Sequence, residues 1–268
     1  MTAPTNRIKA IIRKTPLFGP LKWLAALLGR STYPLPFATM VPTEPFLERA
    51  IARIGHEPNP DRGDEQFYSY FSEIWDDSYE EGLARQYTAY LPHLPQHSNH
   101  PFLDIGCGAG EFVQFLNTHG FMAQGIDSNP TEVARAKERS LDVSCTDALS
   151  YLNTHLECFS GVSMIEVIEH MPPTNVMHLL VAIYRSLNSG GIALIETINI
   201  KNPLAFHTFY TDPTHLRPIS HDYLSFLLQW VGFKDTKIIF TTPAAFTYEQ
   251  RRDPTRAYFN YAITGIKP

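Results

Sequence analysis

From residue 101 onward, short apolar runs alternate with amphipathic helical segments, and this pattern constrains the fold more than any other feature. The apolar runs cover residues 101–106, 122–127, 143–147, 161–167, 190–199, 237–242 and 258–267. Helical spacing of apolar residues marks residues 111–120, 130–140, 173–188 and 220–233. Strands that alternate with helices favour a sheet covered on both faces. We therefore predict an α/β fold with a doubly wound, mostly parallel, seven-stranded sheet.

The chain before residue 101 divides into two further parts. Residues 1–62 are proline-rich, and positions 1–43 carry six cations and no acid. This basic N-terminal arm either packs on the domain, remains partly disordered, or lies on an anionic membrane surface. Residues 63–100 have the pattern of a helical lead-in, which extends the α/β domain of residues 101–268 at its N-terminal side.

Composition excludes several broad classes of protein. A net charge of −5 gives no general reason to expect nucleic-acid binding. Three cysteines, at positions 107, 145 and 158, have no metal-ligand spacing and indicate a reducing compartment. No apolar run approaches the roughly 20 residues that span a bilayer. We expect a cytoplasmic protein, with peripheral contact at the inner membrane face if the arm binds lipid. The sequence leaves the oligomeric state open.

The segment "LDIGCGAGEF" (103–112) follows the first apolar run and opens a helix, the place where open α/β sheets bind nucleotides. Its glycines stand at 106, 108 and 110, whereas a dinucleotide fingerprint needs the third at 111, which is Glu111. Asp104, beneath this turn, would repel a pyrophosphate but attract an ammonium group. Glycine turns also serve ordinary strand-to-helix connections, so the motif alone is weak.

Two further aspartates indicate which chemical groups the ligand carries. Asp127 ends the second run and is placed to accept hydrogen bonds from ribose hydroxyls, while Asp147 ends the third and suits an adenine amino group. A ligand with adenine, ribose and a cationic amino-acid tail, but no phosphate, is S-adenosylmethionine. The alternatives are a nicotinamide enzyme and a non-catalytic nucleotide binder.

The order "LDIGCGAGEF … GIDSNP … CTDALSYL … IEVIEH … GGIALIET" resembles class I SAM-dependent methyltransferases over residues 101–268. The resemblance implies a Rossmann-like methyltransferase fold. It also implies a set of cofactor-binding residues: Asp104, Gly106, Gly108, Gly110, Asp127, Ser128, Asp147, Ala148 and Glu166.

The segment "IEVIEHM" (165–171) spaces Glu166, Glu169 and His170 as E-x-x-E-H. This pattern is similar to that of ubiquinone-pathway O-methyltransferases and of small-RNA 2′-O-methyltransferases, where two glutamates and two histidines hold a divalent metal. The resemblance implies a site for Mg²⁺, Mn²⁺ or Zn²⁺ at Glu166, Glu169, His170 and His215. The alternative is that Glu166 contacts the cofactor, Glu169 caps the next helix, and His170 is a general base or simply buried.

The segment "HTFYTDPTHLRPIS" (207–220) emerges from the same predicted sheet edge, and Pro213 and Pro218 exclude a regular helix through it. With the basic arm and the lead-in, it resembles methyltransferases of bacterial O-antigen, capsule and exopolysaccharide synthesis. We expect His215 to act with His170 in catalysis, as metal ligand or general base, with His207 as a second-choice ligand. Tyr210, Asp212 and Arg217 would orient a polar acceptor, unless they only build and anchor the turn.

The leading hypothesis from sequence is therefore an O-methyltransferase acting on a sugar hydroxyl or sugar phosphate of a surface glycan or its precursor. One alternative is methyl transfer to a quinone or other small phenol. Another is a non-catalytic SAM-fold scaffold in a biosynthetic complex. RNA methylation is disfavoured because the chain shows no basic surface beyond the N-terminal arm.

Overall fold

The computed structural model describes residues 77–95, 98–210, 212–243 and 253–268. The basic arm predicted at 1–62 and the first part of the lead-in lie outside these residues. Within them, no helix is long and apolar enough to cross a bilayer.

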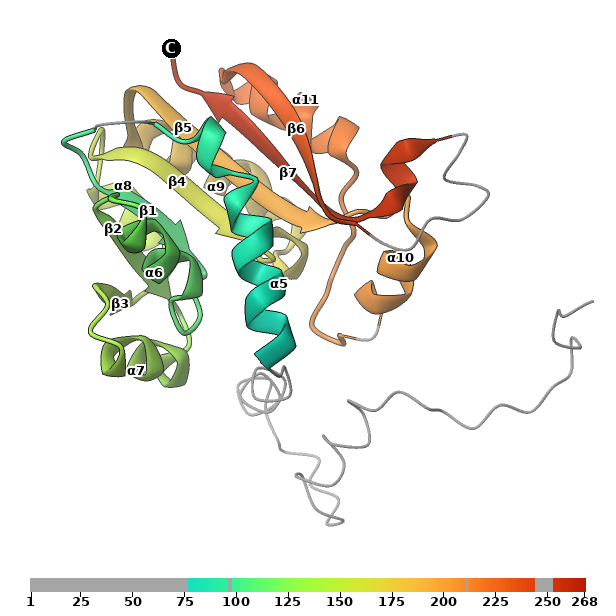
Figure 1. The fold of residues 1–268 in the computed structure, drawn as a ribbon. Helices are drawn as coiled ribbons and strands as arrows, with labels where there is room; N and C mark the ends of the chain where they lie inside the picture. The colour runs from blue at the N-terminus through green and yellow to red at the C-terminus, as the bar shows by residue number, and fades with distance from the viewer. Residues whose placement is uncertain (1–76, 96–97, 211, 244–252) are drawn as a thin grey trace, which may run out of the picture. The chain divides into compact units, whose positions relative to one another are not determined.

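Seven strands form one sheet in the order β3-β2-β1-β4-β5-β7-β6 (Figure 1). Neighbours from β3 to β5 pair in parallel, and β7 runs antiparallel to both β5 and β6. This confirms the predicted doubly wound, mostly parallel sheet. The strands are β1 (Phe102–Ile105), β2 (Ala123–Asp127), β3 (Val143–Cys145), β4 (Phe159–Ile165), β5 (Leu187–Ile198), β6 (Lys234–Pro243) and β7 (Tyr258–Ile266).

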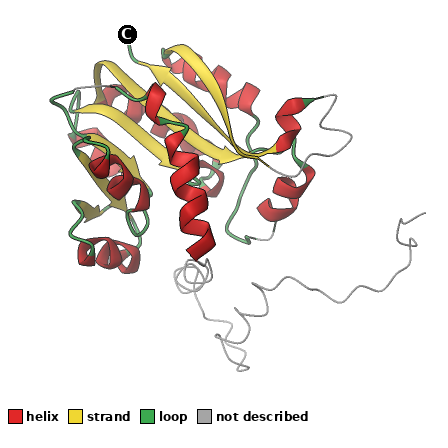
Figure 2. Cartoon of the chain, viewed as in Figure 1, coloured by secondary structure: helices red, strands yellow, loops and turns green. Residues whose placement is uncertain are grey.

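Helices cover both faces of the sheet, as Figure 2 shows. On one face lie α5 (Asp77–Thr88), α6 (Glu111–Thr118) and α7 (Pro130–Glu138), and on the other α8 (Ala148–Thr154), α9 (Pro173–Ser186) and α11 (His221–Val231). Each face has its own apolar core: Phe112, Leu116 and Leu194 belong to the first, and Leu180 and Leu228 to the second. Burial of these side chains is the main stabilising term for such a fold.

Local signals place the helix ends. Asn129 precedes Pro130 and its side chain accepts a hydrogen bond from the Thr131 N–H, which starts α7. Ser220 caps α11 in the same way, and Gly232, with φ +124°, ends it. These are the residue types that a sequence can reveal.

Two short helices were not predicted. The first, α8, begins after Asp147, so Asp147 lies beyond β3 and caps the helix instead of ending the strand. The second, α10 (Pro203–Phe209), is capped by Asn202 and includes the start of segment 207–220. The segment is therefore helical at its beginning, and only its later part, with both prolines, follows the prediction.

Candidate active site

The turn between β1 and α6 has a backbone that only glycine adopts readily. Gly106, Gly108 and Gly110 have φ values of +67°, +53° and +87°. A Cβ at Gly106 would lie 2.5 Å from Val167 Cγ2, and one at Gly110 would lie 2.4 Å from Leu141 Cδ1. At Gly108 the nearest atom would be Glu111 Oε2 at 4.0 Å. The turn is thus packed at its two ends and open at its middle glycine, where a ligand can approach the backbone.

Asp104 forms the floor beneath this turn and is 3% exposed. The Ser163 hydroxyl donates a hydrogen bond to its Oδ1 at 2.6 Å. Burial raises the pKa of Asp104 to about 7; the Ser163 hydrogen bond opposes this rise, and the negative charges of Asp127 and Glu111 add to it. A cationic group would favour the ionised carboxylate here, which fits the ammonium of S-adenosylmethionine.

Asp127 connects the turn to the next loop. Its Oδ2 accepts from the Gly108 N–H at 2.9 Å and its Oδ1 from the Asn129 N–H at 2.8 Å. Carboxylate oxygens have further lone pairs, so these bonds leave capacity for ribose hydroxyls. Asp147 uses Oδ1 to accept from the Ser150 N–H, and it is exposed like Ser128, while Ala148 is partly buried. The predicted cofactor residues therefore surround the carboxyl ends of β1, β2 and β3.

The two predicted catalytic histidines meet although 45 positions separate them in the sequence. His170 ends the 3₁₀ helix η2 (Ile168–His170) just after β4, His215 lies in the loop after α10, and their ring centroids are 4.5 Å apart. The Glu169 carbonyl accepts hydrogen bonds from the N–H groups of Leu216 at 2.9 Å and Arg217 at 3.3 Å. The loop is thus fixed to η2 by its backbone, beside the histidine pair.

Hydrogen bonds determine which nitrogen of each imidazole carries the proton. His215 Nδ1 lies 2.7 Å from the Phe209 carbonyl, which can only accept, so Nδ1 is the N–H and Nε2 has the lone pair. The Thr214 hydroxyl donates to Asp212 at 2.6 Å, so its oxygen accepts from His170 Nδ1 at 3.0 Å. His170 Nε2 is then also unprotonated in the neutral ring.

The pKa of His170 is lowered by burial and by the neighbouring His215, while Glu169 and Asp212 oppose the shift. A neutral imidazole at physiological pH is what both a general base and a metal ligand require.

Glu169 supplies a third potential ligand to the pair. It is 0% exposed, and no N–H group or hydroxyl of the described part of the chain donates to its carboxylate; its side-chain contact is with the carboxyl of Glu166. Ligand atoms of Glu169, His170 and His215 lie within 4.8 Å of one another. A buried carboxylate that meets a second carboxyl and two imidazoles, without an N–H or hydroxyl donor, fits a divalent cation or a shared proton, because burying such a charge uncompensated is unfavourable.

Glu166, the fourth predicted ligand, is outside this group of three, but its carboxyl contacts that of Glu169 and also reaches Asn260 on β7. Its Oε1 accepts from Asn260 Nδ2 at 2.6 Å, and the same Nδ2 donates to Glu196 Oε1 at 2.8 Å. Burial raises the pKa of Glu166 well above its usual range, and the charges of Glu169 and Glu196 and a side-chain hydrogen bond with Glu169 raise it further.

Glu196 and Asn260 were missed in the sequence analysis. A glutamate inside the apolar run "GGIALIETIN" was the one available signal. Asn260 gave none, because its importance depends on how β7 pairs with β5.

The predicted acceptor residues divide into two groups. Asp212 is buried and stabilises the loop that carries His215. Its Oδ1 accepts hydrogen bonds from the Thr214 N–H and hydroxyl, and its Oδ2 lies 3.7 Å from His215 Nε2. Tyr210 is 67% exposed, and Arg217 packs over the Tyr223 ring at 5.8 Å. His207 is exposed on α10 and is not part of the three-residue group.

Comparison with known proteins identifies the family of the chain. The methyltransferase domain family matches residues 77–238, so the chain belongs to that family. A SAM-dependent methyltransferase of Archaeoglobus fulgidus has a similar structure, with a TM-score of 0.65 and 27% identity over 75% of this chain and 100% of its own.

Two curated relatives are named for ubiquinone biosynthesis. The O-methyltransferase of Saccharophagus degradans is 26% identical over 53% of this chain and 65% of its own length. The mitochondrial enzyme of Rattus norvegicus is 30% identical over 44% of this chain and 36% of its own. The chain thus spans less than two thirds of the length of either relative. Their names agree with the E-x-x-E-H resemblance, whereas the polysaccharide resemblance stays a prediction.

Proposed function

We propose that the protein is a SAM-dependent O-methyltransferase that acts on a hydroxyl of a quinone-type or other phenolic small molecule. The observation that carries this proposal is the group of Glu169, His170 and His215 beside the glycine turn, where a hydroxyl proton can be accepted. The names of the curated relatives support the phenolic acceptor over the sugar hydroxyl that the sequence suggested first.

The residues of the turn would bind and orient the cofactor. S-adenosylmethionine, when bound, supplies an electrophilic methyl group. Asp104 would face its ammonium group, Asp127 its ribose hydroxyls, and the open side of Gly108 would let it approach the backbone. Most of the rate enhancement would come from this orientation, because a methyl displacement requires its reacting atoms in line.

The histidine pair would handle the acceptor proton. Each Nε2 has a lone pair, because Phe209 and Thr214 hold the Nδ1 protons. We assign His170 and His215 as the groups that hold or accept the proton of the acceptor hydroxyl, a role that contributes roughly 10²–10⁴-fold to rate in other enzymes. Asp212 would orient His170 through Thr214.

Glu169, His170 and His215 would also be the ligands of a divalent cation, which supplies a Lewis acid that lowers the pKa of a coordinated hydroxyl. Zn²⁺ and Mn²⁺ suit this mixed set better than Ca²⁺, which prefers oxygen ligands alone. In that case the Phe209 carbonyl and the Thr214 hydroxyl would fix the rings from outside.

The deciding experiment incubates the full chain with labelled S-adenosylmethionine and a panel of catechols, monophenols and nucleotide sugars. We expect label in a methyl ether of a catechol or phenol. Label in a sugar product alone would overturn the phenolic assignment, and cofactor binding without transfer to any acceptor would favour the scaffold. A parallel series with EDTA, followed by added Zn²⁺ or Mn²⁺, tests the cation: unchanged activity and no bound metal would exclude it.

A further inference from the structure

A second carboxylate beside the site has a full set of donors. Glu196 lies in β5 and is 0% exposed. Its Oε1 accepts from Gln86 Nε2 and from Asn260 Nδ2, and its Oε2 accepts from the Tyr90 hydroxyl. Gln86 and Tyr90 come from α5 and the turn after it, before the first strand. The lead-in helix therefore reaches the sheet at the candidate site.

Asn260 links this buried carboxylate to Glu166. Its single amide nitrogen lies 2.6 Å from Glu166 Oε1 and 2.8 Å from Glu196 Oε1. A primary amide has two N–H donors, so one side chain can bind both carboxylates at once.

Glu166 needs such support because of its backbone. Its φ is +54°, the left-handed region that a residue with a Cβ rarely adopts. Its N–H donates to the Glu196 carbonyl at 3.3 Å, and the next residue, Val167, packs against Gly106 of the cofactor turn. The direction of the Glu166 side chain is thus set next to the place where the cofactor would bind.

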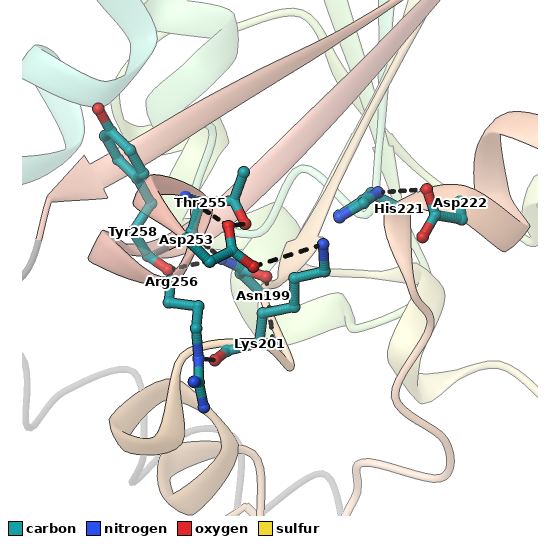
Figure 3. A network of polar contacts seen from close by, with 8 residues as sticks. All are labelled: Asn199, Lys201, His221, Asp222, Asp253, Thr255, Arg256 and Tyr258. Atoms are coloured by element: carbon teal, nitrogen blue, oxygen red, sulfur yellow. Dashed lines mark hydrogen bonds and ion pairs between the residues drawn. The ribbon is translucent and has the colours of Figure 1, made fainter. Parts of the chain in front are cut away.

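The start of the strand that carries Asn260 is tied to the end of β5, as Figure 3 shows for Asn199, Thr255 and Tyr258. The Asn199 side-chain Nδ2 donates to the carbonyls of Thr255 at 2.8 Å and Tyr258 at 2.9 Å, and its backbone N–H donates to the Phe259 carbonyl at 2.7 Å. These bonds join the end of β5 to the start of β7. They fix the register in which Ile198 faces Asn260.

We propose that Asn260 is a positioning residue for Glu166, and that Glu196 with Gln86 and Tyr90 anchors Asn260 from α5. Asn260 acts only through Glu166 and needs no contact with the cofactor. The inference rests on the proposed use of S-adenosylmethionine and is independent of the acceptor.

The test is a double-mutant cycle on the full chain, with S-adenosylmethionine affinity measured by calorimetry. We expect Asn260→Ala to weaken binding about tenfold, the lower end of the loss seen when a group that orients a metal ligand is removed. Glu166→Ala should weaken it at least as much, and the double variant no more than Glu166→Ala alone. Effects that multiply in the double variant, or wild-type affinity in Asn260→Ala, would overturn the proposal.

Thr264→Ala provides the matched control, because Thr264 is buried on the same strand and pairs with Leu194, away from Glu166. It should lower the melting temperature while leaving S-adenosylmethionine affinity unchanged. If it weakens binding as much as Asn260→Ala, loss of strand stability explains both, and the positioning role is excluded. Wild-type protein that binds no S-adenosylmethionine would instead refute the proposed function, so the two failures are distinguishable.

Discussion

The carboxylates of Asp104 and Asp127 and the carboxylate of Glu169 lie at the same edge of the sheet and are stabilised differently. Asp104 and Asp127 accept hydrogen bonds from Ser163, Gly108 and Asn129, and all these donors lie on the turn or on adjoining strands and loops. Glu169 is more deeply buried, and its carboxylate meets the carboxyl of Glu166 but no N–H or hydroxyl donor in the described part of the chain. Asp104 and Asp127 are held by donors of the protein and still have capacity for the ammonium and hydroxyl groups of a cofactor, whereas Glu169 needs a shared proton or a cation.

Replacing Glu169 tests that difference most strongly. Glu169→Leu keeps the volume and removes an unsatisfied buried group, so we expect stability to rise by on the order of 1–3 kcal/mol. If the carboxylate serves the reaction, methyl transfer to a catechol should fall by about 10²–10⁴-fold in the same variant. Thermal unfolding and initial rates measure the two effects. A variant that is less stable yet fully active would mean that Glu169 is an ordinary core residue.

The histidine pair should give the next largest effect. We expect His215→Ala to lower the methyl-transfer rate by roughly 10²-fold, because a proton acceptor is lost from the group around Glu169. His207→Ala on exposed α10 is the control and should keep the wild-type rate. Equal rates for the two variants would show that the meeting of His170 and His215 has no part in the chemistry.

A pH series tests the contribution of the Asp104 carboxyl to cofactor binding. The pKa of Asp104 is raised to about 7, first by burial, so Asp104 is partly protonated at neutral pH. Its ionised form binds a cationic ammonium group, and we expect S-adenosylmethionine affinity to rise about tenfold between pH 6 and pH 8.

The same carboxyl makes its contribution to folding stability at acid pH, below its unfolded pKa, and that contribution is lost as pH rises through about 7. In Asp104→Asn both dependences should flatten; an unchanged affinity profile would point to another group.

A pair of glycine substitutions should have the smallest effects on methyl transfer, and it separates packing from cofactor binding. Gly110→Ala would bring a Cβ to 2.4 Å from Leu141 Cδ1 and should destabilise the fold by about 1–3 kcal/mol. Gly108→Ala has room for its Cβ and should cost only about 1 kcal/mol for the left-handed backbone. We expect Gly108→Ala, despite that smaller cost, to weaken cofactor binding more than Gly110→Ala. Melting temperatures measure the loss of stability in each variant, and calorimetry measures the loss of cofactor affinity.

The cofactor side could be predicted from the sequence because its contacts are local. Gly106, Gly108 and Gly110 mark the turn themselves, and Asp127 sits one strand further along a regular alternation. The order of strands and helices could be predicted for the same reason, because the periodicity of each element is visible within a short stretch of sequence. The short helices α8 and α10 were missed because each has only seven residues, too few to display a period.

The other side of the site depends on contacts between distant positions. His170 and His215 could be paired only by resemblance and by the rule that parallel strands end at one edge. Asn260 and Tyr90 gave no pattern at all, because each matters through a partner about a hundred residues away. Glu166 shows the limit clearly: its motif predicted a metal ligand, which stays a prediction, whereas its hydrogen bond to Asn260 depends on strand pairing that the motif does not contain.

The anchoring of Glu196 by α5 has a consequence for where the folded unit begins. The α/β pattern starts near residue 101, yet a chain cut there would lose Gln86 and Tyr90 and leave a fully buried carboxylate with Asn260 as its one remaining donor among the three described. The helix belongs to the same compact unit as the sheet. A truncated protein that keeps every strand should therefore unfold more easily than the full chain, and it would be a poor substitute for the full chain in any activity assay.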